Sequence, residues 1–226
     1  ADAQARLSFA SSFFEGQTQG SYARGEAFQA HASGGVHGTN GMTSALVGMS
    51  SARTPQELVL AVRRLHLLYA LSFSVGGIPL VYMGDEIGLG NAAAESDIEA
   101  VDGRQLHRPR FDAAAWERRL DPSTPEGLVH QGFLRLTQLR RELPGLDGDV
   151  PAQVLPLAHP GVLGISRAGL FYSFGNFTGE AVELDLAQVL GPDAAAWRNV
   201  LGDPLQDGRL TLPAWSSAWL TRSVPS

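Results

Sequence analysis

Two adjacent carboxylates and a short arginine-rich stretch are the parts of this sequence whose residue types could do chemistry. The carboxylates are Asp85 and Glu86, and the second stretch places three arginines and His107 within residues 102–110. Neighbouring residues cannot straddle a glycosidic bond at the roughly 5 Å that a retaining glycosidase needs. We therefore expect Asp85 and Glu86 to accept hydrogen bonds from nearby loops, and we predict no catalytic residue in this chain.

The arginine-rich stretch is better suited to binding than to catalysis. The planar guanidinium group donates hydrogen bonds in pairs, which suits an anionic or polyhydroxylated ligand, or a salt bridge that shapes a pocket. A solvated run of charges is the alternative. His107 has no second His, Asp or Glu at the helical spacing of a zinc site, so no metal ion is expected.

Composition excludes several classes of protein. The 226 residues carry a net charge of −6 with scattered basic residues, so nucleic acid is not an expected partner. The 17 cationic residues are all arginine and cysteine is absent, which excludes Schiff-base lysines and thiol chemistry, and no cofactor is expected. No apolar run is long enough to span a membrane, and residues 1–6 do not resemble a signal peptide, so we expect a cytoplasmic protein.

The element that positions the two carboxylates is a short apolar segment before them. Thr54-Pro55 begins a helix that extends to about Ser74, and residues 78–82 then form a strand that is apolar on both faces. A buried parallel strand needs neighbours on both sides for its backbone hydrogen bonds, and the sequence contains no second strand of this kind. The chain is therefore expected to be a fragment whose partner strands lie in another segment.

The remaining sequence divides into a helical part and a β-rich part. We predict helices over residues 3–14, 113–120 and 124–143, with a long glycine-rich loop over residues 16–41. From residue 149 onward short strands alternate with turns, and Ala168-Gly169 indicates a tight hairpin. The predicted strands are 153–157, 162–167, 170–174, 181–186, 209–212 and 218–222. We place a domain boundary between residues 148 and 149, with an all-β sandwich after it.

Several stretches together resemble the amylosucrases of the α-amylase superfamily, glycoside hydrolase family 13. The segment GIPLVYMGDE at residues 77–86 resembles the last barrel strand of that superfamily. The stretches that resemble amylosucrases more specifically lie at residues 20–29, 43–48, 107–110, 121–124 and 174–177. The resemblance covers nearly the whole chain, in the same order.

This resemblance implies an α/β plus β architecture in which residues 1–148 are the C-terminal part of a (β/α)8 TIM barrel. A loop subdomain would occupy about residues 15–50, the last barrel strand residues 78–82, and a β-sandwich residues 149–226. The family's catalytic carboxylates lie on earlier strands that this sequence lacks. The whole bacterial enzyme would release fructose from sucrose and extend an α-1,4-glucan, and its missing N-terminal barrel portion would be a partner in cis or in trans.

The resemblance also implies roles for particular side chains. The residue that corresponds to an arginine closing the bottom of the family's glucosyl pocket, by pairing with an upstream aspartate, is Arg104. Asp85, Glu86, His107 and Arg24 would support the pocket. The sequence departs from the family at Leu7 and near residue 38, where the family has arginines close to its acceptor subsites, which leaves acceptor preference open.

Other functions fit parts of the same pattern. A sucrose hydrolase or a trehalose synthase-like enzyme of the superfamily would share most of these motifs. A non-catalytic carbohydrate-binding or interaction module built on the sandwich is a further alternative. To bind sugars it would require exposed aromatic side chains, for which Trp197, Trp215 and Trp219 are the candidates. A truncated product with no function of its own is the remaining alternative.

Overall fold

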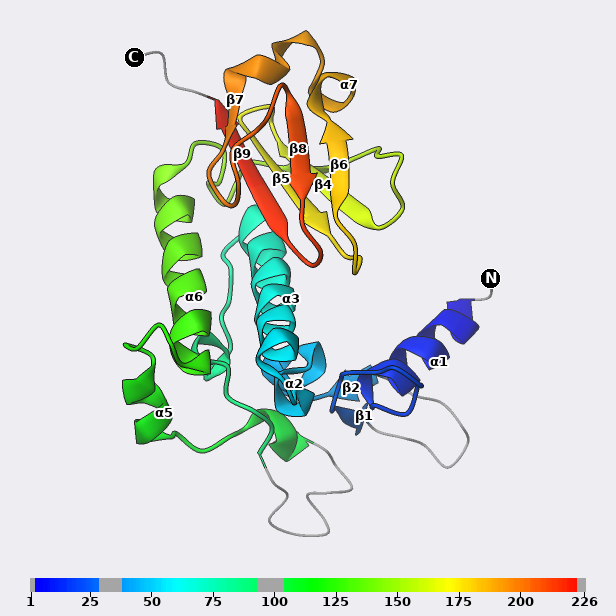
Figure 1. Cartoon of the computed structure of the whole chain (residues 1–226), viewed down its shortest axis with the longest axis vertical. Coiled ribbons are helices and arrows are strands. Elements are labelled where there is room, and N and C mark those ends of the chain that lie inside the picture. Colours follow the sequence, from blue (N-terminus) through cyan, green and yellow to red (C-terminus); the bar gives the residue numbers. More distant parts are fainter. Residues whose placement is uncertain (1–2, 29–37, 93–103, 223–226) are drawn as a thin grey trace. The chain divides into compact units, whose positions relative to one another are not determined.

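The computed structural model describes residues 3–28, 38–92 and 104–222 (Figure 1). The chain falls into two compact units. The first comprises Ala1–Leu65 and Val81–Gln131, and the second comprises His66–Leu80 and Gly132–Ser226. These units differ from the predicted division at residue 148, which stays a prediction.

Helices provide most of the regular structure before residue 149. The α-helices within the described residues are α1 (Ala3–Phe14), α2 (Thr43–Val47), α3 (Pro55–Ser74), α5 (Ala113–Arg118), α6 (Pro125–Glu142) and α7 (Leu186–Leu190). Short 3₁₀ turns lie at η1 (Met49–Ser51), η2 (Asp85–Ile87), η3 (Arg104–His107) and η4 (Pro192–Ala196). Among the described helices, none combines the length and apolar character needed to cross a membrane.

The start of α3 follows from a reciprocal capping arrangement. The main-chain N–H of Glu57 donates to Thr54 Oγ1 at 3.2 Å, and the Thr54 N–H donates to Glu57 Oε2 at 3.3 Å. Two of the helix's otherwise unsatisfied donors are thereby paired, while Pro55 occupies the first helical position, where no N–H is needed. The helix predicted from Thr54-Pro55 is confirmed.

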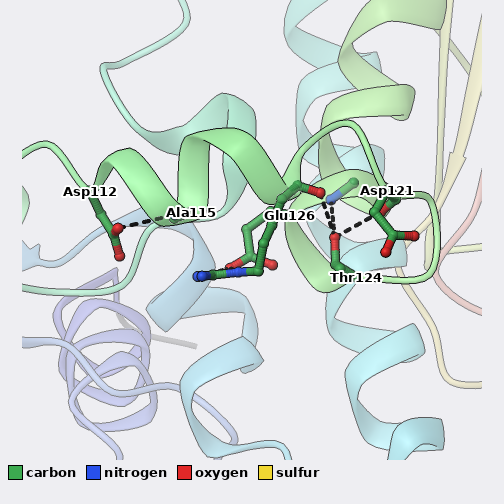
Figure 2. Close-up of polar contacts among 7 residues, drawn as sticks. Asp112, Ala115, Asp121, Thr124 and Glu126 are labelled. Carbon is green, nitrogen blue, oxygen red and sulfur yellow. Dashed lines mark hydrogen bonds and ion pairs between the residues drawn. The ribbon is translucent and has the colours of Figure 1, made fainter.

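The connection between α5 and α6 is fixed by short-range polar contacts (Figure 2). Asp112 caps α5 by accepting from the Ala115 N–H at 3.0 Å. Thr124 Oγ1 accepts from the Gly127 N–H at 3.0 Å and donates to the Asp121 carbonyl at 2.8 Å. The turn between these helices is therefore determined locally by its own side chains.

A short antiparallel hairpin lies within the stretch predicted to be a loop. Strands β1 (Glu26–Phe28) and β2 (Gly38–Asn40) pair with Ala27 opposite Thr39. Residues 29–37 of the predicted loop lie outside the described residues. The prediction for residues 16–41 thus missed one element, whose three-residue strands give too short a pattern to detect.

The β-rich part begins near the predicted position and forms two antiparallel sheets. Its strands are β3 (Ala152–Leu155), β4 (Val162–Arg167), β5 (Phe171–Asn176), β6 (Val182–Asp185), β7 (Trp197–Asn199), β8 (Arg209–Leu212) and β9 (Ser217–Arg222). One sheet has the order β3-β4-β5-β9-β7, and the other pairs β6 with β8. Buried side chains from both sheets, including Phe174, Leu184 and Leu220, share one hydrophobic core. This arrangement is a C-terminal β domain.

The turn at Ala168-Gly169 forms the predicted hairpin between β4 and β5. Both residues have positive φ angles, 50° and 68°, and the Leu170 N–H donates to the Arg167 carbonyl at 2.9 Å. Trp197 and Trp219 are 5% and 0% exposed. These two tryptophans are core residues and cannot form the exposed platform that a carbohydrate-binding module requires.

The predicted strand at residues 78–82 is not formed in this chain. The segment is in neither a helix nor a ladder, and within the described residues all paired strands are antiparallel. Ile78 and Leu80 are 95% and 75% exposed. A segment apolar on both faces gains strand structure only when neighbouring strands supply hydrogen bonds and cover its side chains, and the described chain supplies neither.

Two arginines hold the main chain where α3 ends. Arg167 is fully buried and donates from its guanidinium to the carbonyls of Ser74 at 2.8 Å, Val150 at 3.0 Å and Asp147 at 2.6 Å. Arg140 donates to the carbonyls of Phe73 and Gly77. The last carbonyls of a helix have no partner within it, so these cations also complement the negative end of the α3 dipole.

Burial makes these guanidinium groups somewhat easier to deprotonate. It lowers the pKa of Arg167, the nearby Arg140 lowers it further, and Asp147 and Asp149 oppose the shift. Burial also lowers the pKa of Arg140. Arginine still keeps its charge at neutral pH, because its ordinary pKa lies far above neutrality.

We expect Arg167→Met to lower the free energy of unfolding by about 3 kcal/mol or more, since it leaves the buried Ser74 carbonyl and two partly buried carbonyls without their donor. Urea unfolding followed by circular dichroism measures the change. The control is Arg198→Met on β7, where the arginine is exposed. A loss as small as that of the control would contradict the role assigned to Arg167.

We expect Gly127→Ala to destabilise the α5–α6 connection. A Cβ atom at Gly127 would lie 1.9 Å from the Asp121 carbonyl oxygen, which belongs to the backbone and cannot swing away. The cost is on the order of 2 kcal/mol, measured as a lower midpoint of thermal unfolding. Gly90→Ala is the control, because its Cβ would lie 3.6 Å from the nearest side-chain atom, Ser50 Oγ; equal midpoints for the two variants would refute the expectation.

Candidate functional site

Asp85 and His107, which are distant in the sequence, line one small cavity in the first compact unit. Its volume is about 150 Å³. Thr43 and Tyr82 complete the side-chain lining, together with residues 41–42 at the start of α2. The structure thus brings together two of the residues singled out from the sequence and adds a hydroxyl group and an aromatic ring.

The carboxylate of Asp85 is held beneath this cavity. Asp85 is 3% exposed, and its Oδ2 accepts a hydrogen bond from Thr43 Oγ1 at 2.6 Å. Gly84 precedes it with φ at 95°, a left-handed conformation that favours glycine, and there the chain turns into η2. This turn directs Asp85 inward, where a hydroxyl donor offsets part of the cost of burying a carboxylate.

Three further contacts tie the loop after Asp85 to the segments around Thr43. The Asn91 side chain accepts from the Met42 N–H at 2.7 Å and donates to the Arg24 carbonyl at 2.6 Å. Ser44 Oγ donates to the Leu89 carbonyl at 2.5 Å. Asp85 and Thr43 therefore stay within hydrogen-bonding distance because the two segments that carry them are joined at several points.

His107 is positioned by η3. The Ala92 N–H donates to the Leu106 carbonyl at 2.9 Å, which fixes η3 against the end of the same loop. The His107 ring lies edge-on to the Tyr82 ring, with centroids 6.0 Å apart and planes at 73°. The cavity thus combines a carboxylate, a hydroxyl, an imidazole and an aromatic ring, a set that suits hydrogen bonding to a neutral polyhydroxylated ligand.

The other predicted site residues lie elsewhere or outside the described structure. Glu86 accepts from the Gly84 N–H at 2.8 Å, a contact within its own turn. Arg24 donates to the Ala23 carbonyl at 2.6 Å and lines a different cavity. Arg104 begins η3, but its side chain is outside the described part of the structure, so its substrate-binding role stays a prediction.

Sequence reasoning missed Thr43 and Asn91 as residues of the site. Thr43 lies in the stretch 43–48 that carries the family resemblance, but an isolated threonine gives no sign that it will meet Asp85. Asn91 lies in a loop whose sequence shows neither a hydrophobic periodicity nor a recognisable motif. Within the described ranges, no group of three or more His, Asp or Glu side chains is placed to hold a metal ion.

The cavity is too small to enclose a substrate by itself. Pockets that bury a small molecule usually measure about 300–1,000 Å³, compared with about 150 Å³ here. The residues that line it are Gly41, Met42, Thr43, Tyr82, Asp85 and His107.

No protein-family model matches the sequence. The structure is nevertheless similar to solved structures of α-amylase family enzymes. A trehalulose synthase variant in complex with Tris matches with a TM-score of 0.57 and 16% identity over 80% of this chain and 41% of that chain. An AmyP variant in complex with maltotriose gives 0.56 and 16% over 81% of this chain and 39% of that chain.

A third structure is similar over a smaller share of its length. The type III pullulan hydrolase from Thermococcus kodakarensis matches with a TM-score of 0.50 and 21% identity, over 73% of this chain and 24% of that chain. At these identities the likeness concerns the fold. The chain spans between about a quarter and about half of the length of the enzymes that it matches, so it corresponds to a part of their fold.

We expect Thr43→Val to reduce the free energy of unfolding by about 1–2 kcal/mol, because the buried Asp85 carboxylate loses a hydroxyl donor while the side-chain volume is kept. Chemical denaturation of the purified variant measures the loss. Thr43→Ser retains the donor and should fall within about 0.5 kcal/mol of the original chain. If valine and serine had equal effects, the hydrogen bond to Asp85 would not stabilise the site.

Proposed function

We propose that this chain is the C-terminal portion of a retaining glucosyltransferase that acts on sucrose, similar to the amylosucrases. The whole enzyme would release fructose and pass the glucosyl unit to the 4-hydroxyl of a growing α-glucan. The chain alone is inactive under this proposal, because the catalytic carboxylates come from the missing N-terminal barrel portion.

The observation that carries the proposal is the exposed, extended segment before Asp85. Ile78, Leu80 and Met83 are 95%, 75% and 61% exposed although all three are apolar. Contiguous apolar side chains in solvent mark a surface that another segment covers. A strand of the barrel at this place would receive its covering from both neighbouring strands, which are absent from the sequence.

A reaction that retains the configuration of the glucosyl carbon needs a pair of catalytic carboxylates, and the missing portion would supply that pair. A retaining enzyme needs a nucleophilic carboxylate and an acid on opposite sides of the glycosidic bond, roughly 5 Å apart. Here Asp85 accepts from Thr43, and Glu86 accepts from the Gly84 N–H. These local contacts fit carboxylates that shape loops, and they leave the bond-breaking pair to be supplied by the other portion.

The reaction divides into two balanced steps. In the first, a carboxylate of the missing portion would attack the glucosyl carbon, and the acid would protonate the oxygen that leaves with fructose. In the second, the acceptor hydroxyl would attack the glucosyl-enzyme bond and return a proton to the conjugate base. Water in place of the acceptor gives hydrolysis, and a sugar that re-attaches through another hydroxyl gives an isomer of sucrose.

This chain would contribute the floor and one wall of the glucosyl pocket. Arg104, by its resemblance to the family arginine, would pair with an upstream aspartate at the pocket bottom. His107 and Tyr82 line the small cavity above Asp85 and would border the same pocket once the other portion encloses it. The chain's task is therefore to bind and orient, while the missing portion performs the chemistry.

The test is to assay fructose, glucose and glucan formation from sucrose with this chain, with an independently produced N-terminal barrel portion of an amylosucrase-like protein, and with the two mixed. We expect products only in the mixture. Arg104→Ala should reduce the rate in the mixture by a factor on the order of 10² or more, since a misplaced glucosyl ring is costly for catalysis.

The products distinguish the related activities. Glucan shows transfer, glucose in equal amount to fructose shows hydrolysis, and an isomeric disaccharide shows isomerisation. Fructose release by this chain on its own would overturn the proposal, because it would place the catalytic carboxylates within these residues.

A further inference from the structure

A larger cavity of about 380 Å³ lies elsewhere in the first compact unit, next to the start of α3. It is formed by the loop at residues 20–24, the turn at residues 48–53 and the first turns of α3. The charged groups that line it are Arg24, Arg53, Arg64 and Glu57. The cavity at Asp85 uses none of these four side chains, and Arg24, which the family resemblance assigned to the support of the glucosyl pocket, lines this cavity instead.

Arg64 is held in a fixed position at this cavity. Its guanidinium carbon lies 3.7 Å from the centroid of the Tyr22 ring, and its Nη1 donates to the Val47 carbonyl at 3.1 Å. Burial lowers the pKa of Arg64 and raises that of Tyr22, while the attraction between the two groups opposes both shifts. A guanidinium stacked on an aromatic ring is oriented before any ligand arrives.

The one acidic side chain at the cavity is engaged with the backbone. Glu57 Oε2 accepts from the Arg53 N–H at 2.6 Å and from the Thr54 N–H at 3.3 Å, as part of the cap of α3. Arg24 donates to the carbonyls of Ala23 and Ser21, which are uncharged. Among the described residues, neither Arg24 nor Arg53 forms an ion pair. Three positive groups therefore face one carboxylate, an excess of two positive charges.

We propose that this cavity binds a small oxyanion, either free phosphate or the phosphate group of a sugar ester. Guanidinium groups present paired N–H donors that match the oxygen atoms of a phosphoryl group, and they keep their charge at every physiological pH. A polymeric anion would need an extended basic stripe, whereas these arginines line one partly open cavity. The cavity therefore binds a ligand other than the sugars of the proposed reaction.

The cavity is large enough for either a phosphate ion or a sugar phosphate. A phosphate ion fills only part of about 380 Å³, and the rest could hold a hexose. Gly48, which also lines the cavity, has φ at 102°, and a Cβ there would lie 3.0 Å from Tyr22 Cβ. The backbone thus approaches the Tyr22 side chain so closely that a larger residue at position 48 would press on it.

Isothermal titration calorimetry with inorganic phosphate and with glucose 1-phosphate tests the proposal at constant ionic strength, because diffuse binding to exposed arginines is screened by salt. We expect saturable binding that Arg53→Gln and Arg24→Gln each weaken about tenfold. Arg63→Gln is the matched control, since Arg63 is exposed on α3 next to Arg64 and lines a different surface hollow. Glucose 1-phosphate binding much tighter than phosphate would assign the site to a sugar ester, and equal binding would assign it to the free ion.

Arginine modification gives a second readout that depends on no substitution. The chain has no lysine, so phenylglyoxal followed by mass spectrometry reports on arginines alone. Phosphate should slow modification of Arg24 and Arg53 and leave Arg63 unaffected. Absence of saturable binding, or equal protection of all three arginines, would overturn the proposal. Neither readout involves sucrose, so failure here would leave the proposed reaction untouched.

Discussion

The buried Arg167 guanidinium is the interaction on which the second compact unit depends. It donates to the carbonyl of Ser74 at the end of α3 and to the carbonyls of Asp147 and Val150, which precede β3. A single β4 side chain thus satisfies backbone groups from two separate segments, of which the Ser74 carbonyl would otherwise be buried without a donor. Arg140 adds a bond to the Gly77 carbonyl, and the Gly77 N–H donates to the Gly148 carbonyl at 2.9 Å.

These contacts decide where the exposed segment begins. The Arg140 side chain and the main chain hold Gly77 in place through hydrogen bonds. The side chain of the next residue, Ile78, is almost fully exposed. In the first unit, the chain is fixed again at Asp85 by Thr43. The stretch between these contacts is apolar, with Ile78 and Leu80 exposed. Under the proposed function, neighbouring strands of a larger fold would cover it.

Local signals explain which elements could be predicted from the sequence. The cap at Thr54 and the positive φ angles at Ala168-Gly169 depend on residues close in sequence, so the start of α3 and the β4–β5 hairpin were predictable. The strand predicted at residues 78–82 is not formed, because no strand within the described residues pairs with it and ladder formation needs a paired neighbour. The contacts Thr43–Asp85 and Tyr22–Arg64 join residues that are far apart in the sequence, and no local sequence pattern predicts such contacts.

Hydrogen exchange of the backbone amides at Ile78, Leu80, Val81 and Tyr82 tests the central claim most directly. The chain should be compared alone and after joining to the N-terminal barrel portion of an amylosucrase-like protein. We predict rapid exchange in the isolated chain and strong protection in the joined protein, because neighbouring strands then accept these N–H groups. Rapid exchange in both proteins would contradict the claim that residues 78–82 form a barrel strand once neighbouring strands pair with them.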